Sequence, residues 1–555
     1  MTFGWAAMVV APVASGAALI RQGWAPVFGE RGTIAALTVD SLSRDPPLVG
    51  MPTSLGFEDG ASLSHAGPLG FWLLAIPTQL LGEPGHGLIV GALAVALLSI
   101  ASVAALMRRH GDVHLEALAL VLVAAMVAGI GGGILADPFN PYLGVLPLLL
   151  CLVSTWGVLA GHHRQLWVLV LAGSLTAQVH LGYVLLVVSL VALASVSLAA
   201  DIMRGAGPRR RRLTNRIIPI GVLLGLAAWT GPILDQLLGT GNLVRLWRSQ
   251  FGDRPVAGID HGVDVAVEMT SIPPRWLVGR ATDGFLDDPS SVRVVFSLVS
   301  IVLVVALGIR AIRRRDRVTA SLSVVSIVSI VAATLSTARL LEVYPGYFDS
   351  ERLLFYRLFW WPVGMFFTLT LVWGSVRSVA LTPIHGAGSG VSRDLAGRWT
   401  SVIAVVGVVL IAPLGYRSAP EGAEAIYEHD VVHAEAIAGL PGSPSSVALR
   451  FHPEGHPPPA PNHPAYTVSM GLVAQLRLRG IAVRFPADGE QRVAVRGYRA
   501  EHWASGDEPV VLLYRAGADA RLDPPPGYRR ISITGPAPDE PINPLSVEST
   551  VFVRS

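Results

Sequence analysis

Apolar segments recur along the whole chain, and each is bounded by arginine clusters or by Pro, Gly and Asp. Most are about 20 residues long, the length at which an α-helix crosses the hydrocarbon core of a bilayer. The chain has 555 residues, of which 52% are hydrophobic and 15% charged, whereas a soluble protein carries about 25% charged residues. The sequence therefore predicts an α-helical protein that crosses the membrane many times.

The apolar segments predict eleven membrane passes. The run from Leu166 to Met203 is too long for one crossing, so we divide it at "QVHLGY", where a turn at the membrane surface is expected. The expected passes are residues 4–22, 86–107, 115–136, 141–160, 165–180, 182–202, 216–234, 292–312, 318–338, 354–375 and 399–416.

Arginine-rich loops fall on one side of this topology, and positive charge marks the cytoplasmic side of membrane proteins. These loops are "RRH" at 108–110, "HHR" at 162–164, "RGAGPRRRRLTNR" at 204–216, "RAIRRRDR" at 310–317, and 376–398. The N-terminus is then cytoplasmic and the C-terminus extracytoplasmic, in a multi-pass protein of the plasma membrane. The opposite loops are long and rich in Asp, Asn, His, Tyr and Pro, which places any chemistry on the outer face.

The first outer loop, residues 23–85, contains a further apolar segment, "GPLGFWLLAIPTQLLG" at 67–82. It is short and contains Pro77, and counting it as a pass would reverse every later loop against the arginine distribution. We expect it to be an interfacial or re-entrant helix on the outer leaflet.

The apolar passes stop at about residue 418. We expect a transmembrane domain over residues 1–417 and a small extracytoplasmic α/β domain over 418–555. "SSVALRF", "GIAVRFP", "QRVAVRGY", "EPVVLLYRA" and "RRISITG" have the composition of short strands, and "TVSMGLVAQLRLRG" has helical spacing. The plain interpretation of this domain is that it binds carbohydrate or acceptor.

Two acids follow the first apolar segment, in "GERGTIAALTVDSLSRD". Glu30 is expected at the boundary between membrane and water, where partial removal from water makes a carboxylate a better proton acceptor. An equally simple interpretation is that Glu30 merely ends the helix. Asp40, on a short helix suggested by "TIAALTVDSL", is the second candidate, whereas Asp45 precedes two prolines and is expected to shape a turn.

Further polar residues of the outer loops are candidates for binding a phosphate or a sugar. Asp137, Asn140 and His180 lie in very short loops between apolar helices. Such loops do not need acidic, amide and imidazole groups for solubility, which favours a polar site over helix capping. Arg31 and Arg44 suit phosphate oxygens, although contact with lipid headgroups explains them equally well. The candidate binding residues are Arg44, His65, Asp137, Asn140, His180, Arg245 and Arg352.

Several classes of function lack support in the sequence. It contains no His-Glu-x-x-His, no Walker lysine, no Gly-x-Ser-x-Gly and no cysteine pair, and Cys151 is the single cysteine. The histidines do not group at metal spacing. A transporter would place ionisable groups or broken helices at mid-membrane, whereas the charged groups here lie at helix ends.

The order of these parts resembles the GT-C superfamily of membrane glycosyltransferases, which use polyprenyl-phosphate sugars. The stretches "GERGTIAALTVDSL", "PLVGMPTSLGF", "SHAGPLGFWLLAIPTQLLG", "DPFNPYLGVLPLLL" and "QVHLGYVLL" are similar to an actinobacterial branch of that superfamily. Three positions depart from the pattern of that branch. Glu30 stands in place of Asp, Ala66 in place of Pro and Phe139 in place of Trp.

This resemblance implies an inverting sugar transfer from a polyprenyl-phosphate donor to a cell-envelope acceptor on the outer face. Glu30, with Asp40 as the runner-up, would be the general base, and cationic or hydrogen-bonding groups would stabilise the departing phosphate. A divalent cation shared by the acids and the phosphate is an open alternative that no spacing indicates. No nucleic-acid partner is expected. Two other functions stay open, a non-catalytic scaffold of envelope biosynthesis and a flippase for lipid-linked sugars.

Overall fold

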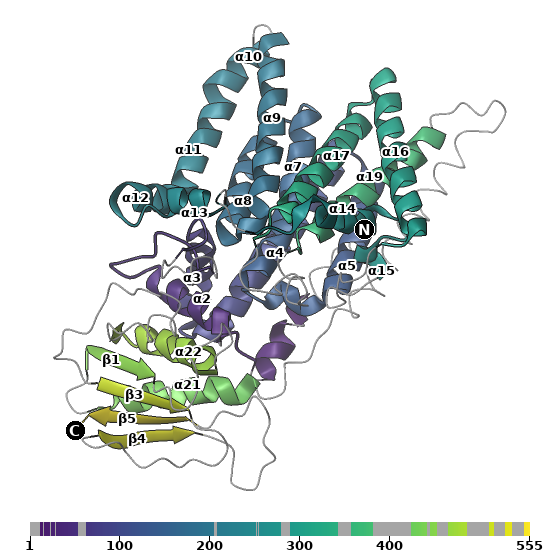
Figure 1. Ribbon diagram of the computed structural model, residues 1–555. Helices are drawn as coiled ribbons and strands as arrows, with labels where there is room; N and C mark the ends of the chain where they lie inside the picture. The colour runs from purple at the N-terminus through teal and green to yellow at the C-terminus, as the bar shows by residue number, and fades with distance from the viewer. Residues whose placement is uncertain are drawn as a thin grey trace. The chain divides into compact units, whose positions relative to one another are not determined.

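The structure is a computed structural model that describes residues 12–53 (except 15, 23 and 28), 63–204, 208–250, 252, 255–278, 289–341, 357–380, 423–440, 444–451, 464–484, 510–515, 528–534 and 549–554. The chain forms two compact units (Figure 1). Unit 1 comprises Met1–Ser15, Leu93–Leu135 and Asn140–Arg417, and unit 2 comprises Gly16–Ala92, Ala136–Phe139 and Ser418–Ser555. The separate domain expected from residue 418 onward stays a prediction.

Unit 1 is built from helices. The longer ones are α4 (Pro84–His110), which begins in unit 2, α5 (Val113–Ile130), α7 (Val145–Leu159), α8 (Gln165–Val179), α9 (Val184–Arg204), α11 (Ile218–Ala228), α14 (Gly258–Thr270), α16 (Ser291–Arg313), α17 (Arg317–Ala338) and α19 (Trp360–Ala380). The shorter ones are η1 (Gly132–Ala136), α6 (Asn140–Leu143), η2 (Leu181–Tyr183), α10 (Pro208–Arg212), η3 (Leu213–Ile217), α12 (Thr230–Leu238), α13 (Asn242–Gln250) and α15 (Arg275–Val278).

Six helices of the described chain are long and apolar enough to cross a membrane, or seven if α11 and α12 together form one bent span. The predicted multi-pass helical membrane protein is thus confirmed. The count of eleven passes stays a prediction, because the last expected pass, 399–416, and much of the first, 4–22, lie outside the described residues.

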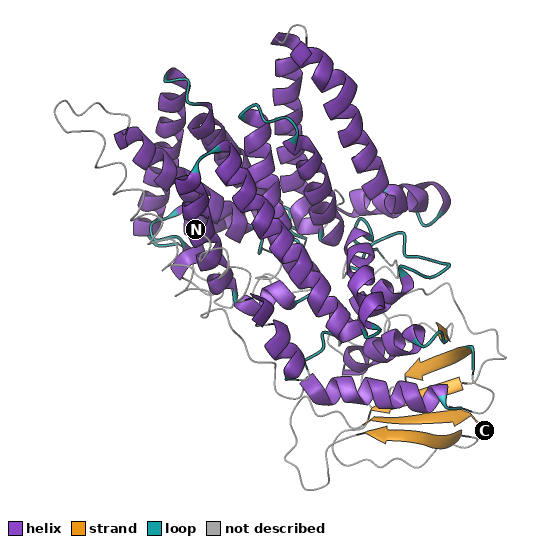
Figure 2. Cartoon of the chain, turned by 180° about the vertical axis from the view of Figure 1, so that it is seen from behind, coloured by secondary structure: helices purple, strands orange, loops and turns teal. Residues whose placement is uncertain are grey.

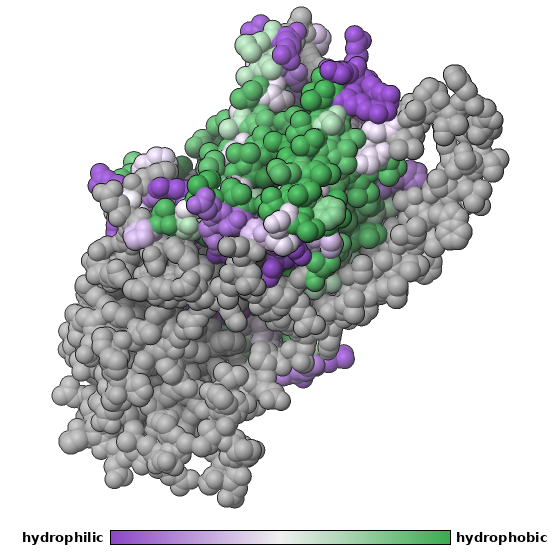
Figure 3. Space-filling model, turned by 45° about the vertical axis from the view of Figure 1, so that its right-hand side comes forward, coloured by the Kyte–Doolittle hydropathy of each residue, from purple (hydrophilic) through white to green (hydrophobic). Residues whose placement is uncertain are grey.

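Helix α16 shows why unit 1 belongs in lipid. Along its middle the exposed side chains are mostly large and apolar, and include Val295, Leu298 and Val302, whereas its buried residues include Ser300 and Gly308. A soluble helix shows the opposite pattern, but small residues between helices and large apolar residues toward lipid are typical of membrane helices. Figure 3 shows the resulting apolar face, bounded above and below by hydrophilic residues.

The predicted break near residue 180 is confirmed, because α8 ends at Val179 and the chain is extended at His180. A second break, between α11 and α12, bends the chain by 58°. Its cause is Pro232, which has no N–H for the carbonyl of Ala228 four residues earlier. The amide of Gln178 donates to that carbonyl instead, at 2.8 Å.

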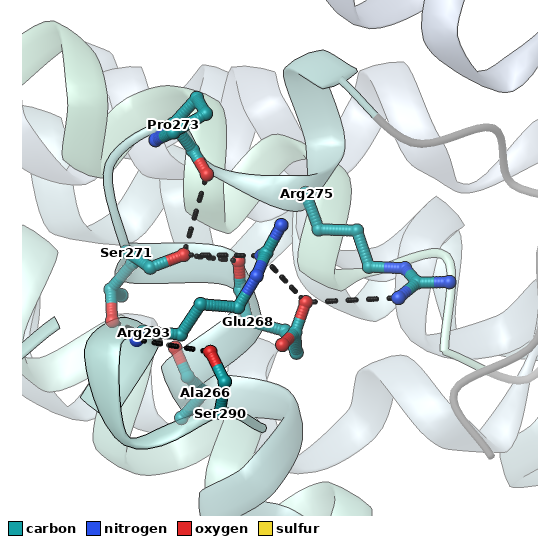
Figure 4. A network of polar contacts seen from close by, with 8 residues as sticks. Ala266, Glu268, Ser271, Pro273, Arg275, Ser290 and Arg293 are labelled. Carbon is teal, nitrogen blue, oxygen red and sulfur yellow. Dashed lines mark hydrogen bonds and ion pairs between the residues drawn. The ribbon is translucent and has the colours of Figure 1, made fainter. Parts of the chain in front are cut away.

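An ion-pair network connects α14, α15 and α16 in unit 1 (Figure 4). Glu268 of α14 is 7% exposed. Its Oε2 lies 2.7 Å from Arg293 Nη1 at the start of α16, and 3.7 Å from Arg275 Nη1 of α15. Arg293 Nη1 also lies 3.4 Å from the hydroxyl of Ser271. Two arginines thus share one buried carboxylate, which therefore keeps both of them close to α14.

Unit 2 contains α2 (Gly29–Asp40) and α3 (Leu69–Leu81), as well as the start of α4. Helix α3 coincides with the expected interfacial helix and ends at Gly82, which has the left-handed backbone that glycine adopts most readily (φ 65°). Glu83 caps the start of α4, because its carboxylate accepts the backbone N–H of Gly85 at 2.7 Å and that of His86. A side chain at Gly87 would collide with Thr78, so α3 and α4 pack with their backbones close together.

Unit 2 also contains a five-stranded mixed sheet in the order β2-β1-β3-β5-β4. The strands are β1 (Ser446–Phe451), β2 (Ala482–Arg484), β3 (Val510–Arg515), β4 (Tyr528–Thr534) and β5 (Ser549–Arg554). β1 is parallel to β2 and β3, whereas β5 is antiparallel to β3 and β4. Helices α21 (Ala423–Ala438) and α22 (Pro464–Leu478) pack on each other and on the sheet (Figure 2).

Four of the expected strands, and the helix expected within 467–480, are present as β1, β2, β3, β4 and α22. The fifth expected strand, "QRVAVRGY", lies outside the described residues. The sequence analysis did not foresee α21 or β5.

Replacing Gln178 by Leu should destabilise the protein by about 1–3 kcal/mol, because the Ala228 carbonyl would then stay buried without its donor. The midpoint of thermal unfolding in detergent measures the effect. Ser189→Ala is the matched control, since the Ser189 hydroxyl bonds to Leu185 of its own helix. Equal unfolding midpoints for Gln178→Leu and Ser189→Ala would contradict this account of the bend.

Candidate functional site

The first turn of α2 carries Glu30 and Arg31, and Arg31 joins α2 to the loop that contains Asp137. Arg31 Nε donates to Asp137 Oδ1 at 2.8 Å, and Nη2 donates to Oδ2 at 2.6 Å. Asp137 Oδ1 also accepts the backbone N–H of Phe139 at 3.0 Å, and the guanidinium carbon of Arg31 lies 4.9 Å from the centre of the Phe139 ring. A two-point contact between the planar guanidinium and a carboxylate fixes both groups in orientation.

This contact changes the role we assign to Asp137. The sequence suggested a phosphate or sugar ligand, but both carboxylate oxygens accept from Arg31, and the Asp137 residue is only 7% exposed. The carboxylate therefore serves to hold Arg31, directly beside Glu30 in the chain. Glu30 itself is partly exposed, which suits a group that has to exchange a proton with a substrate.

Asp40, the second candidate base, lies at the other end of α2. A helix rises 1.5 Å per residue, so the ten residues from Glu30 to Asp40 span about 15 Å along its axis. Asp40 is 2% exposed, and its Oδ1 lies 3.7 Å from Nε of Arg477 in α22. The two acids cannot serve the same reacting hydroxyl, and the more accessible of them is Glu30.

Arg44 and His65 also belong to unit 2. Arg44 is exposed in the turn that follows α2. His65 is 7% exposed and lies in a short antiparallel pairing, where its N–H donates to the carbonyl of Met51 at 2.8 Å and its carbonyl accepts from Gly50 at 3.0 Å. The backbone of His65 is therefore held against the segment that leads away from α2.

Asn140 and His180 lie in unit 1. Asn140 begins α6, and the carbonyl of the next residue, Pro141, accepts the hydroxyl of Tyr183. The carbonyl of Gly182 accepts the hydroxyl of Ser336 in α17 at 2.8 Å. The His180–Tyr183 turn is thereby fixed to both α6 and α17.

His180 has a defined protonation in this turn. Its Nδ1 accepts the backbone N–H of Gly182 at 3.1 Å, so the neutral ring carries its proton on Nε2. Burial lowers the pKa of His180 to about 4. The ring is therefore a neutral hydrogen-bond donor at physiological pH, and it adds no charge to the site.

The remaining candidates lie in later parts of unit 1. Arg245 is partly buried on α13, next to the exposed Trp247 and Arg248. Arg352 lies outside the described residues.

Nearby in the sequence, Arg357 precedes α19 and is only 2% exposed. Burial, together with the charge of Arg357, lowers the pKa of His261 on α14 to about 4.

The residues that the structure describes do not form a convincing site for a divalent cation. They contain no group of three His, Cys, Asp or Glu side chains placed to hold a metal. A metal bound at Asp137 would also have to displace Arg31 from both carboxylate oxygens.

Comparison with solved structures identifies the fold. ArnT from Cupriavidus metallidurans bound to undecaprenyl phosphate matches with a TM-score of 0.51 at 12% identity, over 98% of this chain and 97% of that one. The apo state of the same protein matches with the same score over 99% and 98%. ArnT is a GT-C membrane glycosyltransferase. The chain has the GT-C fold.

The Archaeoglobus fulgidus oligosaccharyltransferase, also a GT-C protein, matches with a TM-score of 0.38 at 12% identity, over 79% of this chain and 58% of that one. A score at that level does not by itself establish a shared fold. No family model and no curated protein sequence matches the chain. The assignment to the GT-C fold therefore comes from the three-dimensional comparison with ArnT, in agreement with the resemblance noted in the sequence.

Within this GT-C fold the site residues fall into two groups. Unit 2 contains Glu30, Asp40, Arg44, His65 and Asp137, and unit 1 contains Asn140, His180 and Arg245. The contact between Arg31 and Asp137 joins positions 106 residues apart, and the sequence analysis named both residues without pairing them. Arg477 was missed, because an arginine late in a helix gives no indication of a partner more than 400 residues earlier.

Breaking the contact between Arg31 and Asp137 should destabilise unit 2. Asp137→Asn and Arg31→Met should each cost about 1.5–3 kcal/mol, the range for a hydrogen bond to a charged group. The double variant should be no worse than the worse single variant, because one interaction is lost in every case. Unfolding midpoints in detergent test this, and additive losses would show that the two residues act independently.

The buried neutral His180 predicts a pH-dependent stability. The folded-state pKa of about 4 lies below the ordinary value of 6.5, so protonation favours the unfolded chain. Stability is then complete above pH 6.5 and falls toward pH 4, by at most about 1.4 kcal/mol per pH unit. His180→Asn should lose less stability than the wild type between pH 7 and pH 5. Parallel losses in the two proteins would refute the assignment.

Proposed function

We propose that this protein transfers a sugar from a polyprenyl-phosphate donor to a hydroxyl group of a cell-envelope acceptor, on the outer face of the plasma membrane. The observation that carries the proposal is the position of Glu30, a partly exposed acid in the first turn of α2, directly beside an arginine fixed by Asp137, in a chain with the GT-C fold. The ArnT structure with undecaprenyl phosphate supports a lipid phosphate as the donor carrier.

In the proposed reaction Glu30 accepts the proton of the acceptor hydroxyl as its oxygen attacks the anomeric carbon. The bond from that carbon to the phosphate oxygen breaks on the opposite face, and its electron pair stays with the polyprenyl phosphate. The new glycosidic bond therefore has inverted configuration. A single displacement of this kind needs one base and a stabilised leaving group.

The leaving phosphate gains negative charge, which fixed cations and hydrogen-bond donors stabilise. In unit 2 we assign this role to Arg44 and His65. His180, Arg245 and Arg352 are the further candidates from the sequence. His180 would act as a neutral donor through Nε2, as its contact with Gly182 requires. Asn140 would contact the donor, Asp137 would act through Arg31, and the polyprenyl tail would lie near α3.

The orientation of the chain follows from the arginine loops. The N-terminus would be cytoplasmic, and residues 418–555 would form an extracytoplasmic domain. Arabinofuranose and mannose are both candidate sugars, because pocket shape, which distinguishes them, is not written in the sequence. A divalent cation has no step in this scheme.

Replacement of Glu30 by Gln tests the proposal, because it removes the proton acceptor and keeps the size of the side chain. Transfer should fall by about 10²–10⁴-fold. The measurement uses purified protein in bilayers, polyprenyl phosphates carrying radiolabelled arabinofuranose or mannose, and cell-envelope extract as acceptor. Asp45→Asn is the matched control, since Asp45 is an exposed acid in the turn after α2, and it should retain wild-type activity.

Two results would reject parts of this proposal. Full activity in Glu30→Gln would remove Glu30 as the base. A wild-type protein that binds the donors but transfers neither sugar would instead support a non-catalytic scaffold, and movement of the donor across the bilayer without transfer would support a flippase.

A further inference from the structure

Helix α22 lies along α2, although more than 400 residues separate them in the chain. Residues 32–40 of α2 and 470–476 of α22 are all buried. The segment expected to be a separate carbohydrate-binding or acceptor-binding module thus contributes a helix that packs directly on the element whose first turn carries Glu30. Both helices belong to unit 2.

The two helices meet at glycines. A Cβ atom placed at Gly32 would lie 2.9 Å from the backbone nitrogen of Gly471 and 2.9 Å from Cβ of Met470. Atoms at that distance collide, so the backbones can approach this closely only because position 32 has no side chain. Gly32 comes two residues after Glu30, so this contact lies within one helical turn of the proposed base.

The other end of α2 is held by charge. Asp40 Oδ1 lies 3.7 Å from Nε of Arg477, and Arg477 Nη2 lies 3.5 Å from the carbonyl of Val483 in β2. Asp40 is 2% exposed, so loss of this cationic neighbour would weaken the stabilisation of a buried charge. Arg477 therefore connects the end of α2 to the sheet.

We propose that Arg477 and Gly471 are positioning residues for sugar transfer, which fix α2 along its length and so fix the carboxylate of Glu30. This inference depends on the proposed function. It assigns the C-terminal segment a part in catalysis itself, and it makes Asp40 a partner of Arg477 and not a base. A displacement of about 1 Å at a reacting group can lower a rate by about 10²-fold, so the position of α2 matters to the reaction.

The test is a double-mutant cycle in the full chain, with Asp40→Asn, Arg477→Gln and both changes together. Each single variant should lower kcat by about 10- to 100-fold, and the double variant should be no worse than the worse single variant. The KM for the donor should change little. The pH profile of kcat should keep its shape, because the base is still present, and Arg477→Lys should recover part of the activity.

Hydrogen exchange at residues 29–40 gives a readout that does not need activity. Exchange should become faster in Arg477→Gln, because α2 loses a restraint. Arg479→Gln is the matched control, since Arg479 lies two residues away and pairs with Glu435, whose side chain is 65% exposed. It should change neither the exchange of α2 nor kcat. Gly471→Val provides an independent disturbance of the contact between the helices and should also accelerate exchange.

Distinct results would overturn this proposal. Loss of transfer in Asp40→Asn with wild-type kcat in Arg477→Gln would show that Asp40 acts chemically. Unchanged kcat and unchanged exchange of α2 in Arg477→Gln and Gly471→Val would show that α22 does not position α2. Glu30→Gln, measured in the same preparations, separates these outcomes from failure of the proposed function. Full activity of Glu30→Gln would reject Glu30 as the general base, but it would not contradict the contact between α2 and α22.

Discussion

Hydrocarbon offers no hydrogen bonds to a backbone amide or carbonyl, and this constraint governs unit 1. At three places in the described helices, a side chain from elsewhere bonds a backbone group next to a bend, a turn or a helix end. Gln178 bonds Ala228 at the bend before Pro232, Ser336 bonds Gly182 at the turn after α8, and Trp167 bonds the carbonyl of Ile217 at the end of η3. The polar residues of an apolar chain are thus placed where its helices break.

Much of the architecture could be predicted because it depends on local composition. The long helices follow from apolar length, the break at His180 from a run too long for one pass, and β1 to β4 from short β-branched segments. Helix α21 was missed because "AEAIYEHDVVHAEAIA" is too polar to be noticed as a core helix. β5 was missed because its six residues, considered by themselves, carry no pattern that distinguishes a strand from an irregular segment.

The candidate site was predicted less well than the fold, because its important contacts join distant parts of the sequence. Glu30, Asp137 and His180 could be recognised as polar residues in unexpected surroundings, but the pairing of Asp137 with Arg31 could not. The same applies to Asp40, whose burial and whose neighbour Arg477 the sequence did not indicate. The sequence shows which polar residues are unusual for their surroundings, whereas function depends on which of these residues contact one another in the folded protein.

The strand order has a consequence for biosynthesis. β5 lies between β3 and β4, so the sheet cannot be completed until residue 554 has been synthesised. α22 packs on β2 and β3 of this sheet, and α2, which is made more than 400 residues earlier, packs on α22. A nascent chain can therefore have its membrane helices in the bilayer while the first turn of α2 still lacks its support. The surroundings of Glu30 are thus completed only after α22 and the strands beside it have been made, later than most of the membrane helices.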